Sequence, residues 1–299
     1  MGTSLCMQGN RSPSLWKILS LVIATGWVGC GGDVSRWRLQ DTRMTDQTAH
    51  VLPEGRLEVG AGLVGTRVEN LGVSLPVRYG AGAGVEVSAN VAHLALGVVN
   101  AQAEWEFHES PNGSFSLRAG VLWLNPEFFW WASDEQREAL GDAVEVLLVP
   151  VELLTTLPVS SGVDATLSVG YTHAAAIGGL SDDSSHATGQ FGTRDLVVGG
   201  QFTFVVTPKV ALNLGAQVPV WAASHVNASG ETEIAPGVVV GVVTDELIEH
   251  DISGLYTVEF SAIVLRDDLW LRIGLVQNYR FITGTIPFPI PTIDMAWRF

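Results

Sequence analysis

Apolar and polar residues alternate with a period of two along most of the chain after residue 50. The clearest segment runs from Val99 to His108, where Val, Ala, Ala, Trp and Phe alternate with Asn, Gln, Glu, Glu and His. Alternation of this kind predicts a β-strand with one apolar face and one polar face. We identify about twelve such segments, each about ten residues long, as expected for a transmembrane β-barrel.

Two segments fit this pattern poorly. The stretch from Val144 to Pro158 alternates weakly, although we assign it to a strand. The valine-rich stretch Ile234–Val243 lies inside the longest predicted loop and could form a thirteenth strand. Because an odd number would break the parity of the barrel, we interpret it as a loop element or as an extension of a neighbouring strand. The predicted number of strands is therefore about 12, within a range of roughly 10 to 14.

The predicted connections alternate between short and long. The short ones are Gly80–Gly84, Glu109–Gly113, Pro158–Gly162, Thr207–Lys209 and Arg266–Asp268. Those between them are mostly long, and they include Leu124–Ala143, His173–Arg194 and Trp221–Ile252. Transmembrane barrels have short periplasmic turns and longer extracellular loops. The sequence therefore predicts a single all-β antiparallel transmembrane barrel with both termini in the periplasm.

The last nine residues, Pro291–Phe299, also alternate and end on an aromatic residue. This ending resembles the C-terminal signal of bacterial outer-membrane β-barrel proteins, carried here by Ile293, Met295, Trp297 and Phe299. The hairpin around Gly80–Gly84 likewise resembles those of many uncharacterised outer-membrane barrels. The resemblance implies a location in the bacterial outer membrane, contact with membrane lipid and insertion by the barrel-assembly machinery.

The N-terminus has the order of charge and hydrophobicity of an export signal. Arg11 and Lys17 precede an apolar run from residue 18 to residue 28, which is too short to span a bilayer. The sequence Trp-Val-Gly-Cys ending at Cys30 resembles the lipobox of bacterial lipoproteins, although Trp27 stands where that family usually has Leu. Both lipidation of Cys30 and ordinary signal-peptide cleavage remain open. We expect residues 1–29 to form the signal peptide, 30–50 a periplasmic tether and 51–299 the barrel.

Composition excludes several functions. The chain has 31 acidic and 16 basic residues, and no cluster of Lys and Arg forms a stripe that would bind nucleic acid. Its two cysteines, Cys6 and Cys30, leave at most one in the mature chain, so no internal disulfide is expected. We find no spaced calcium-loop motif and predict neither a metal nor a cofactor.

If the apolar faces of the strands meet lipid, the polar faces line the interior. The predicted interior charges are Arg56, Glu58, Arg78, Glu86, Glu104, Glu106, Arg118, Asp164, Glu259, Arg272, Asp294 and Arg298. Residues of both signs are present, which favours ion pairs across a water-containing interior. This pattern is compatible with a selective channel, and equally with a blocked structural barrel that is braced by its charges.

The outer loops are acidic and would form a negative vestibule that concentrates cations. The aromatic cluster Phe128–Trp131 in one of them could stack on a sugar or an aromatic ligand, but we favour a place in the interfacial girdle. Trp105, Phe107, Phe202 and Phe204 would lie at the periplasmic rim.

Enzymatic candidates are weak. Outer-membrane lipid hydrolases of similar size carry a His-x-Ser pair near the outer rim, whereas His108-Glu109-Ser110 falls at a predicted periplasmic turn. His225 and Ser229 are the remaining pair, and they lack the spacing of a nucleophile and its base. We therefore expect a passive pore or a structural surface protein and no enzyme. The alternatives are an outer-membrane lipid hydrolase and a soluble secreted β-sandwich, and the oligomeric state is not predicted.

Overall fold

The computed structural model describes residues 48–63, 73–125, 133, 145–181, 185–235, 238–250, 256–266, 268–278 and 289–299. All of these residues belong to one compact unit, residues 37–299. The predicted signal peptide, Cys30 and the Phe128–Trp131 cluster lie outside the described residues.

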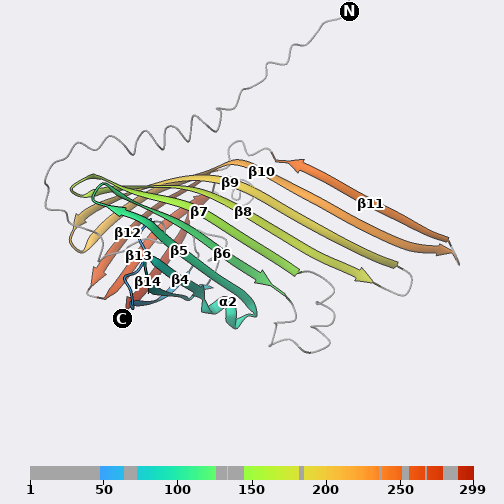
Figure 1. Ribbon diagram of the computed structural model, residues 1–299, viewed down its shortest axis with the longest axis horizontal. Coiled ribbons are helices and arrows are strands. Elements are labelled where there is room, and N and C mark those ends of the chain that lie inside the picture. The colour runs from blue at the N-terminus through green and yellow to red at the C-terminus, as the bar shows by residue number, and fades with distance from the viewer. Residues whose placement is uncertain are drawn as a thin grey trace, which may run out of the picture. The chain divides into compact units, whose positions relative to one another are not determined.

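The described residues form one antiparallel sheet and one helix, α2 (Val91–Ala95) (Figure 1). The strands are β1 (Leu57–Leu63), β2 (Val73–Ser74), β3 (Pro76–Gly82), β4 (Val85–Asn90), β5 (Val98–Ser110), β6 (Gly113–Leu124), β7 (Glu145–Ser160), β8 (Val163–Ser181), β9 (Ser185–Thr207), β10 (Val210–Ala235), β11 (Val238–Glu249), β12 (Thr257–Arg266), β13 (Leu269–Asn278) and β14 (Ile290–Arg298).

Twelve of these strands close into a ring. The last strand, β14, pairs with β1 from Glu58↔Arg298 to Leu63↔Ile293, and β9 pairs with β10 to complete the circuit. Closure leaves no open edge in the ring, so each ring strand has a partner on both sides. The predicted all-β antiparallel barrel of about twelve strands is confirmed. The alternative of a β-sandwich is wrong, because the single sheet closes on itself.

The ring has two distinct ends. The turn end carries the hairpin turns of β3–β4, β5–β6, β7–β8, β9–β10 and β12–β13, together with Leu57 and Phe299. The opposite end, here the ribbon end, carries α2 and the tips of β8–β11. Near it, β2 and β3 both pair with β1 and are separated by Leu75. The Asn90 side chain accepts hydrogen bonds from the backbone N–H groups of Leu75 (3.0 Å) and Ala92 (3.1 Å), so it bridges this break and caps α2.

Two predicted outer loops prove to be largely β-structure. The stretches His173–Arg194 and Trp221–Ile252 belong mostly to β8, β9, β10 and β11, whose ends reach beyond the other strands at the right of Figure 1. Strand β10 has 26 residues, or roughly 85 Å at about 3.3 Å per residue, whereas 9–11 residues suffice to cross a bilayer core. Polar residues on both faces of these extensions hide the alternation that reveals a half-buried strand.

Strand β11 resolves the question of Ile234–Val243. It pairs with β10 from Ala223↔Glu249 to Ala235↔Val238, outside the ring of twelve. Closer to the turn end, the same edge of β10 pairs with β12, beginning at Gln217↔Thr257. The additional strand therefore leaves the even number of ring strands intact.

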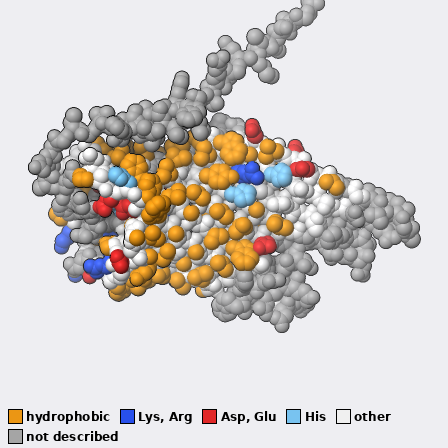
Figure 2. All heavy atoms as spheres, viewed as in Figure 1, with side chains coloured by type: hydrophobic (Ala, Val, Ile, Leu, Met, Phe, Trp, Pro, Cys, Tyr) orange, Lys and Arg blue, Asp and Glu red, His pale blue; other side chains and the backbone are white. Residues whose placement is uncertain are grey.

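The polarity of the barrel is inverted relative to a soluble protein. Many of its large apolar side chains point outward and are exposed, including Trp105 at 52%, and they cover much of the wall visible in Figure 2. Many inward side chains are polar and buried, including Glu58 at 1% and Arg118 at 4% exposure. A soluble domain buries its apolar side chains instead.

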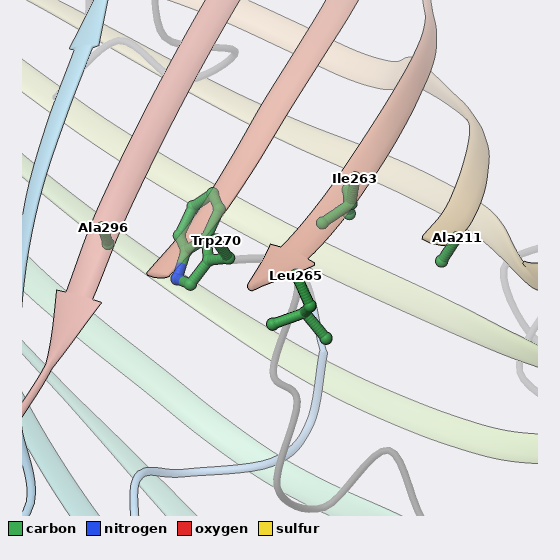
Figure 3. Packing of buried hydrophobic residues seen from close by; sticks show 5 residues of the cluster. All are labelled: Ala211, Ile263, Leu265, Trp270 and Ala296. Carbon is green, nitrogen blue, oxygen red and sulfur yellow. The ribbon is translucent and has the colours of Figure 1, made fainter. Parts of the chain in front are cut away.

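A small apolar cluster interrupts the polar interior. It consists of Ala211, Ile263, Leu265, Trp270 and Ala296, which come from β10, β12, β13 and β14 near the turn end (Figure 3). These side chains occupy inward positions that are polar elsewhere, and the sequence analysis did not identify them. They give this part of the interior a dry, packed lining.

Candidate functional site

Glu58 is the centre of a chain of ion pairs inside the barrel. Its Oε2 accepts from Arg298 Nε at 2.8 Å and from Trp270 Nε1 at 3.1 Å, and its Oε1 lies 3.4 Å from Arg78 Nη1. The cause is the strand register, which places Arg298 and Arg78 directly opposite Glu58 on the two neighbouring strands. One buried carboxylate thus pairs with two arginines across β14, β1 and β3.

The ion pairs continue around the wall to β7. Arg78 Nε lies 3.1 Å from Glu86 Oε1 on β4, and Glu86 lies opposite Glu104 on β5. Arg118 of β6 binds Glu104 Oε2 through Nε (2.8 Å) and Nη2 (2.6 Å), and its Nη1 lies 3.2 Å from Glu152 Oε2 on β7. We call this set the charge ladder: Arg298, Glu58, Arg78, Glu86, Glu104, Arg118 and Glu152.

A second cluster lies beside the charge ladder, on β12, β13 and β14. Arg272 of β13 donates from Nε to Asp294 Oδ2 at 2.8 Å, and its Nη1 lies 3.5 Å from Glu259 Oε1. Together the two groups contain four arginines and six acidic residues, namely Arg78, Arg118, Arg272 and Arg298 against Glu58, Glu86, Glu104, Glu152, Glu259 and Asp294. The formal charge of this lining is negative.

Pairing is what makes these charges tolerable inside the barrel. A charge taken out of water costs several kcal/mol unless a partner and hydrogen bonds compensate it, and removing one partner of a buried pair typically costs about 3–5 kcal/mol. Arg118 shows such compensation, because Glu104 and Glu152 flank it and Ser116 Oγ donates to Glu104 Oε1 at 2.7 Å. The arginine is therefore held in one orientation.

Residues 48–54, here the N-terminal segment, cross the turn end of the interior. The backbone N–H of Ala49 donates to Thr156 Oγ1 of β7 at 2.9 Å, and that of Leu52 to Glu86 Oε2 of β4 at 2.8 Å. Between them, His50 Nδ1 lies 3.0 Å from Glu106 Oε1 of β5. Anchors on β4, β5 and β7 draw the segment across the barrel to the start of β1.

The N-terminal segment is packed closely against the wall. Ala49, Val51 and Leu52 are exposed by only 0%, 5% and 3%. A Cβ added at Gly80 would lie 2.0 Å from the carbonyl oxygen of Pro53, so only glycine permits this approach. Residues 48–50, which the sequence assigns to the tether, already lie at the barrel.

Two small polar cavities lie within the barrel wall lining. One, of about 50 Å³, is bordered by Arg78, Arg118, Asn90 and Asn100 among others, and a second, of about 20 Å³, by Glu152, Glu259, Gln201 and Gln217. A cavity needs about 10–15 Å³ to hold a water molecule. Both spaces are large enough for water molecules.

The remaining predicted interior residues behave differently. Arg56 is exposed at the turn end, just before β1, and Asp164 is half-buried on β8. Glu106 contacts the N-terminal segment, through His50 Nδ1 and the backbone N–H of Val51. The sequence analysis did not identify Glu152 or Trp270: Glu152 lies in the poorly alternating β7, and Trp270 is an apolar residue on an inward position.

The C-terminal residues complete the ring. Phe299 N–H donates to the carbonyl oxygen of Leu57 at 2.8 Å, and Leu57 N–H donates to that of Phe299 at 3.2 Å. Trp297 is 42% and Phe299 66% exposed, and Ile293 is exposed as well, while Met295 is half-buried. On the outer wall the tilted rings of Trp105 and Phe107 lie 5.6 Å apart between centroids, and those of Phe202 and Phe204 lie 6.3 Å apart.

The two enzymatic candidates are not assembled into sites. His225 Nε2 pairs with Asp245 Oδ1 at 2.6 Å, while Ser229 Oγ pairs with Thr188 Oγ1 at 3.0 Å. Four residues along a strand separate His225 from Ser229 by about 13 Å. Ser110 Oγ donates to the carbonyl oxygen of Gly113 within the hairpin turn.

The described part of the chain contains no group of three His, Cys, Asp or Glu residues placed to hold a metal ion. No helix there has the length and apolar character needed to cross a membrane.

Comparison with known proteins gives structural similarity only. No protein-family model matches the sequence, and no curated protein matches it. Similar solved structures include the ferric citrate transporter FecA in its unliganded form (8% identity, TM-score 0.38, 82% of this chain and 42% of that one), the CymD monoaromatic hydrocarbon channel (8%, 0.34, 82% and 89%) and the Pseudomonas putida toluene transporter TodX (9%, 0.36, 82% and 88%). The chain spans less than half of the FecA structure. Similarity this low does not indicate a shared activity.

Proposed function

We propose that the protein is a bacterial outer-membrane barrel that forms a narrow channel for water and small cations, restricted at its periplasmic end by the N-terminal segment. The observation that carries this proposal is the charge ladder with its acidic excess, enclosed by an apolar outer wall. The short turns and both barrel termini then lie on the periplasmic side, as in other barrels of this kind.

The outer wall supports a location in the membrane. On β8 the outward residues from Val163 to Tyr171 are apolar, and on β9 those from Val206 to Leu196 are apolar or glycine. These stretches of nine and eleven residues match the 9–11 tilted residues that cross a bilayer core. Aromatic residues at the turn end, such as Trp105 and Phe204, suit the interface between lipid and water.

The interior supports a preference for cations. Six carboxylates against four arginines leave a negative potential along the lining, and a low-dielectric wall strengthens it. Rings of carboxylates select cations in other pores. Glu152 and Glu259 border the same polar cavity, where they would attract a hydrated cation.

The turn end supports a size limit. The two hollows beside the charged residues have room for water molecules. The N-terminal segment, anchored to Glu86, Glu106 and Thr156, occupies part of the turn end. Permeation of larger solutes would require this segment to leave.

Conductance in a planar bilayer tests the proposal. We expect single-channel steps of low conductance and a reversal potential in a KCl gradient that indicates cation preference. Glu259→Gln should lower the ratio of cation to anion permeability about threefold by removing one charge from the lining. Glu246→Gln, on β11 outside the ring, is the matched control and should leave the ratio unchanged. An absence of steps from pure folded protein, or a preference for anions, would refute the channel as proposed.

One observation favours a second function, that of a surface structural protein. Strands β8–β11 extend beyond the ring. Their extensions pair with one another and would lie outside the membrane. If the purified barrel shows no conductance while removal of the β10–β11 extension abolishes a surface phenotype, this function replaces the channel.

A further inference from the structure

We infer that the outer wall of β8–β10 carries a binding site for the phosphate-bearing headgroup of a membrane lipid, formed by Arg194 and His173. The inference rests on the membrane location proposed above. It concerns the lipid-facing side of the wall, away from the channel interior.

The strand register places two contrasting rows of side chains next to each other. Tyr171, Leu196 and Trp221 lie opposite one another on β8, β9 and β10 and form the first row. The next row toward the ribbon end contains His173, Arg194 and Ala223. An apolar and aromatic row is thus followed directly by a basic one.

The boundary between these rows coincides with the end of the apolar belt. From the turn end, the outward positions of β9 are Val206, Phe204, Phe202, Gly200, Val198 and Leu196, and Arg194 is the first charged residue among them. Tyr171 and Trp221 are 38% and 39% exposed, as expected of aromatic side chains at headgroup depth. Figure 2 shows basic and histidine side chains together at the edge of the hydrophobic wall.

Arg194 is available to a ligand. It is exposed, and it forms no hydrogen bond or ion pair with any residue in the described ranges. The inward arginines differ, because each has an acidic partner: Arg78, Arg118, Arg272 and Arg298. A guanidinium can donate two parallel hydrogen bonds to two oxygens of one phosphate. Arg194 therefore suits a phosphate ligand.

His173 adds a second unsatisfied group. Its Nδ1 atom is buried and has no hydrogen-bond partner within the described part of the chain. Because His173 lies directly opposite Arg194, a phosphate held by the guanidinium would lie within reach of the imidazole. A buried polar atom without a partner is costly, so a turn of the imidazole that brings Nδ1 to a phosphate bound at Arg194 would remove that cost.

Nearby carboxylates do not neutralise Arg194. Glu249 of β11 lies on the same row but one strand beyond Ala223, and Asp245 pairs with His225 at 2.6 Å. Neither forms an ion pair with Arg194. The neighbouring Asp195 alternates to the inward face. The positive charge of Arg194 therefore faces the lipid, where the available anion is a headgroup phosphate.

Binding of three matched probes to the detergent-solubilised full-length protein tests the site. The probes are dioleoylphosphatidylglycerol, dioleoylglycerol, which lacks the phosphate, and glycerol phosphate, which lacks the acyl chains. We expect the phospholipid to bind in native mass spectrometry and Arg194→Gln to weaken its apparent affinity about tenfold. Arg266→Gln is the matched control, because Arg266 is exposed on the same outer wall at the turn end. Its loss should change the affinity less than twofold.

Several results would overturn the inference. Equal affinity of Arg194→Gln and the unaltered protein would exclude Arg194, and equal binding of dioleoylglycerol would exclude the phosphate. Saturable binding of glycerol phosphate with the affinity of the lipid would indicate a site for free anions. Insertion into vesicles and the heat-dependent gel shift are measured on the same samples. Failure there refutes the membrane barrel, whereas normal insertion with unchanged lipid binding refutes only the headgroup site.

Discussion

Arg298, the penultimate residue, donates from Nε to Oε2 of Glu58 on the first strand at 2.8 Å, across 240 positions of the chain. The two residues are also register partners in the β14–β1 pairing that closes the ring. The first and last strands of the ring are therefore held together at this seam both by backbone hydrogen bonds and by a buried ion pair. Glu58 also binds Arg78 and Trp270, so several strands depend on one carboxylate.

Replacing Glu58 should destabilise the barrel strongly. Glu58→Gln leaves Arg298 and Arg78 without this counter-charge, and we expect a loss of about 3–5 kcal/mol in the free energy of unfolding, as for other broken buried pairs. The heat-dependent gel shift should occur at a markedly lower temperature. Glu246→Gln, which removes an exposed carboxylate on β11, should leave the midpoint unchanged. Equal midpoints for both variants would show that the seam does not need the ion pair.

A methyl group at Gly80 should displace the N-terminal segment. In Gly80→Ala the new Cβ would collide with the backbone of Pro53 and Leu52, at 2.0 and 2.5 Å from their oxygens. We expect faster proteolysis near residue 50 and a higher single-channel conductance. Gly162→Ala at the β7–β8 turn is the control, because its Cβ would meet its nearest neighbour at 3.5 Å. Unchanged conductance in Gly80→Ala, despite faster proteolysis, would show that the segment does not restrict the channel.

Deleting Phe299 should impair assembly more than truncating its side chain. The deletion removes both backbone hydrogen bonds to Leu57 and the exposed aromatic ring, whereas Phe299→Ala removes only the ring. We expect the folded, heat-modifiable fraction in membranes to fall at least severalfold on deletion. Phe107→Ala, which removes another exposed ring, should assemble normally. Normal insertion of the deletion variant would argue against an assembly signal at this end.

Shortening the β10–β11 extension should leave the barrel intact. Ala228 and Thr244 are register partners, so an Asn-Gly turn in place of Ser229–Val243 closes a shorter hairpin without shifting the remaining pairs. Because β11 pairs only with β10 outside the ring, we expect the unfolding midpoint to change by no more than a few degrees. Loss of the heat-dependent shift would mean that the extension supports the ring.

The sequence predicts the ring well because most of its wall separates two different environments. On β5, Trp105 and Phe107 face outward while Glu104 lies buried inside, and this contrast is visible as alternation. The extensions of β8–β11 lack that contrast, so they were predicted as loops. Asp245 and Leu247, for example, are outward neighbours of the same strand and both are exposed.

Residues in the interior were predicted as far as their charge revealed them. The register between neighbouring strands decides which residues pair with Glu58 and Arg118. A period-two pattern alone does not fix that register. Ile263 and Trp270 are inward despite being apolar, so alternation of polarity gives no indication of their place. The path of residues 48–54 depends on two backbone N–H groups, which every sequence has, and on the single side chain of His50, which forms no repeating pattern.

Residues 48–54 link the closing seam to other strands of the ring. Their backbone is tied to Thr156 and Glu86 on strands that lie on both sides of β5 and β6, and they continue directly into β1, one of the two strands of the closing seam. A segment at this place can dock either while the β1–β14 seam is still open or from the turn end once the ring has closed. In both cases its anchors join β4, β5 and β7 to the chain that enters the seam.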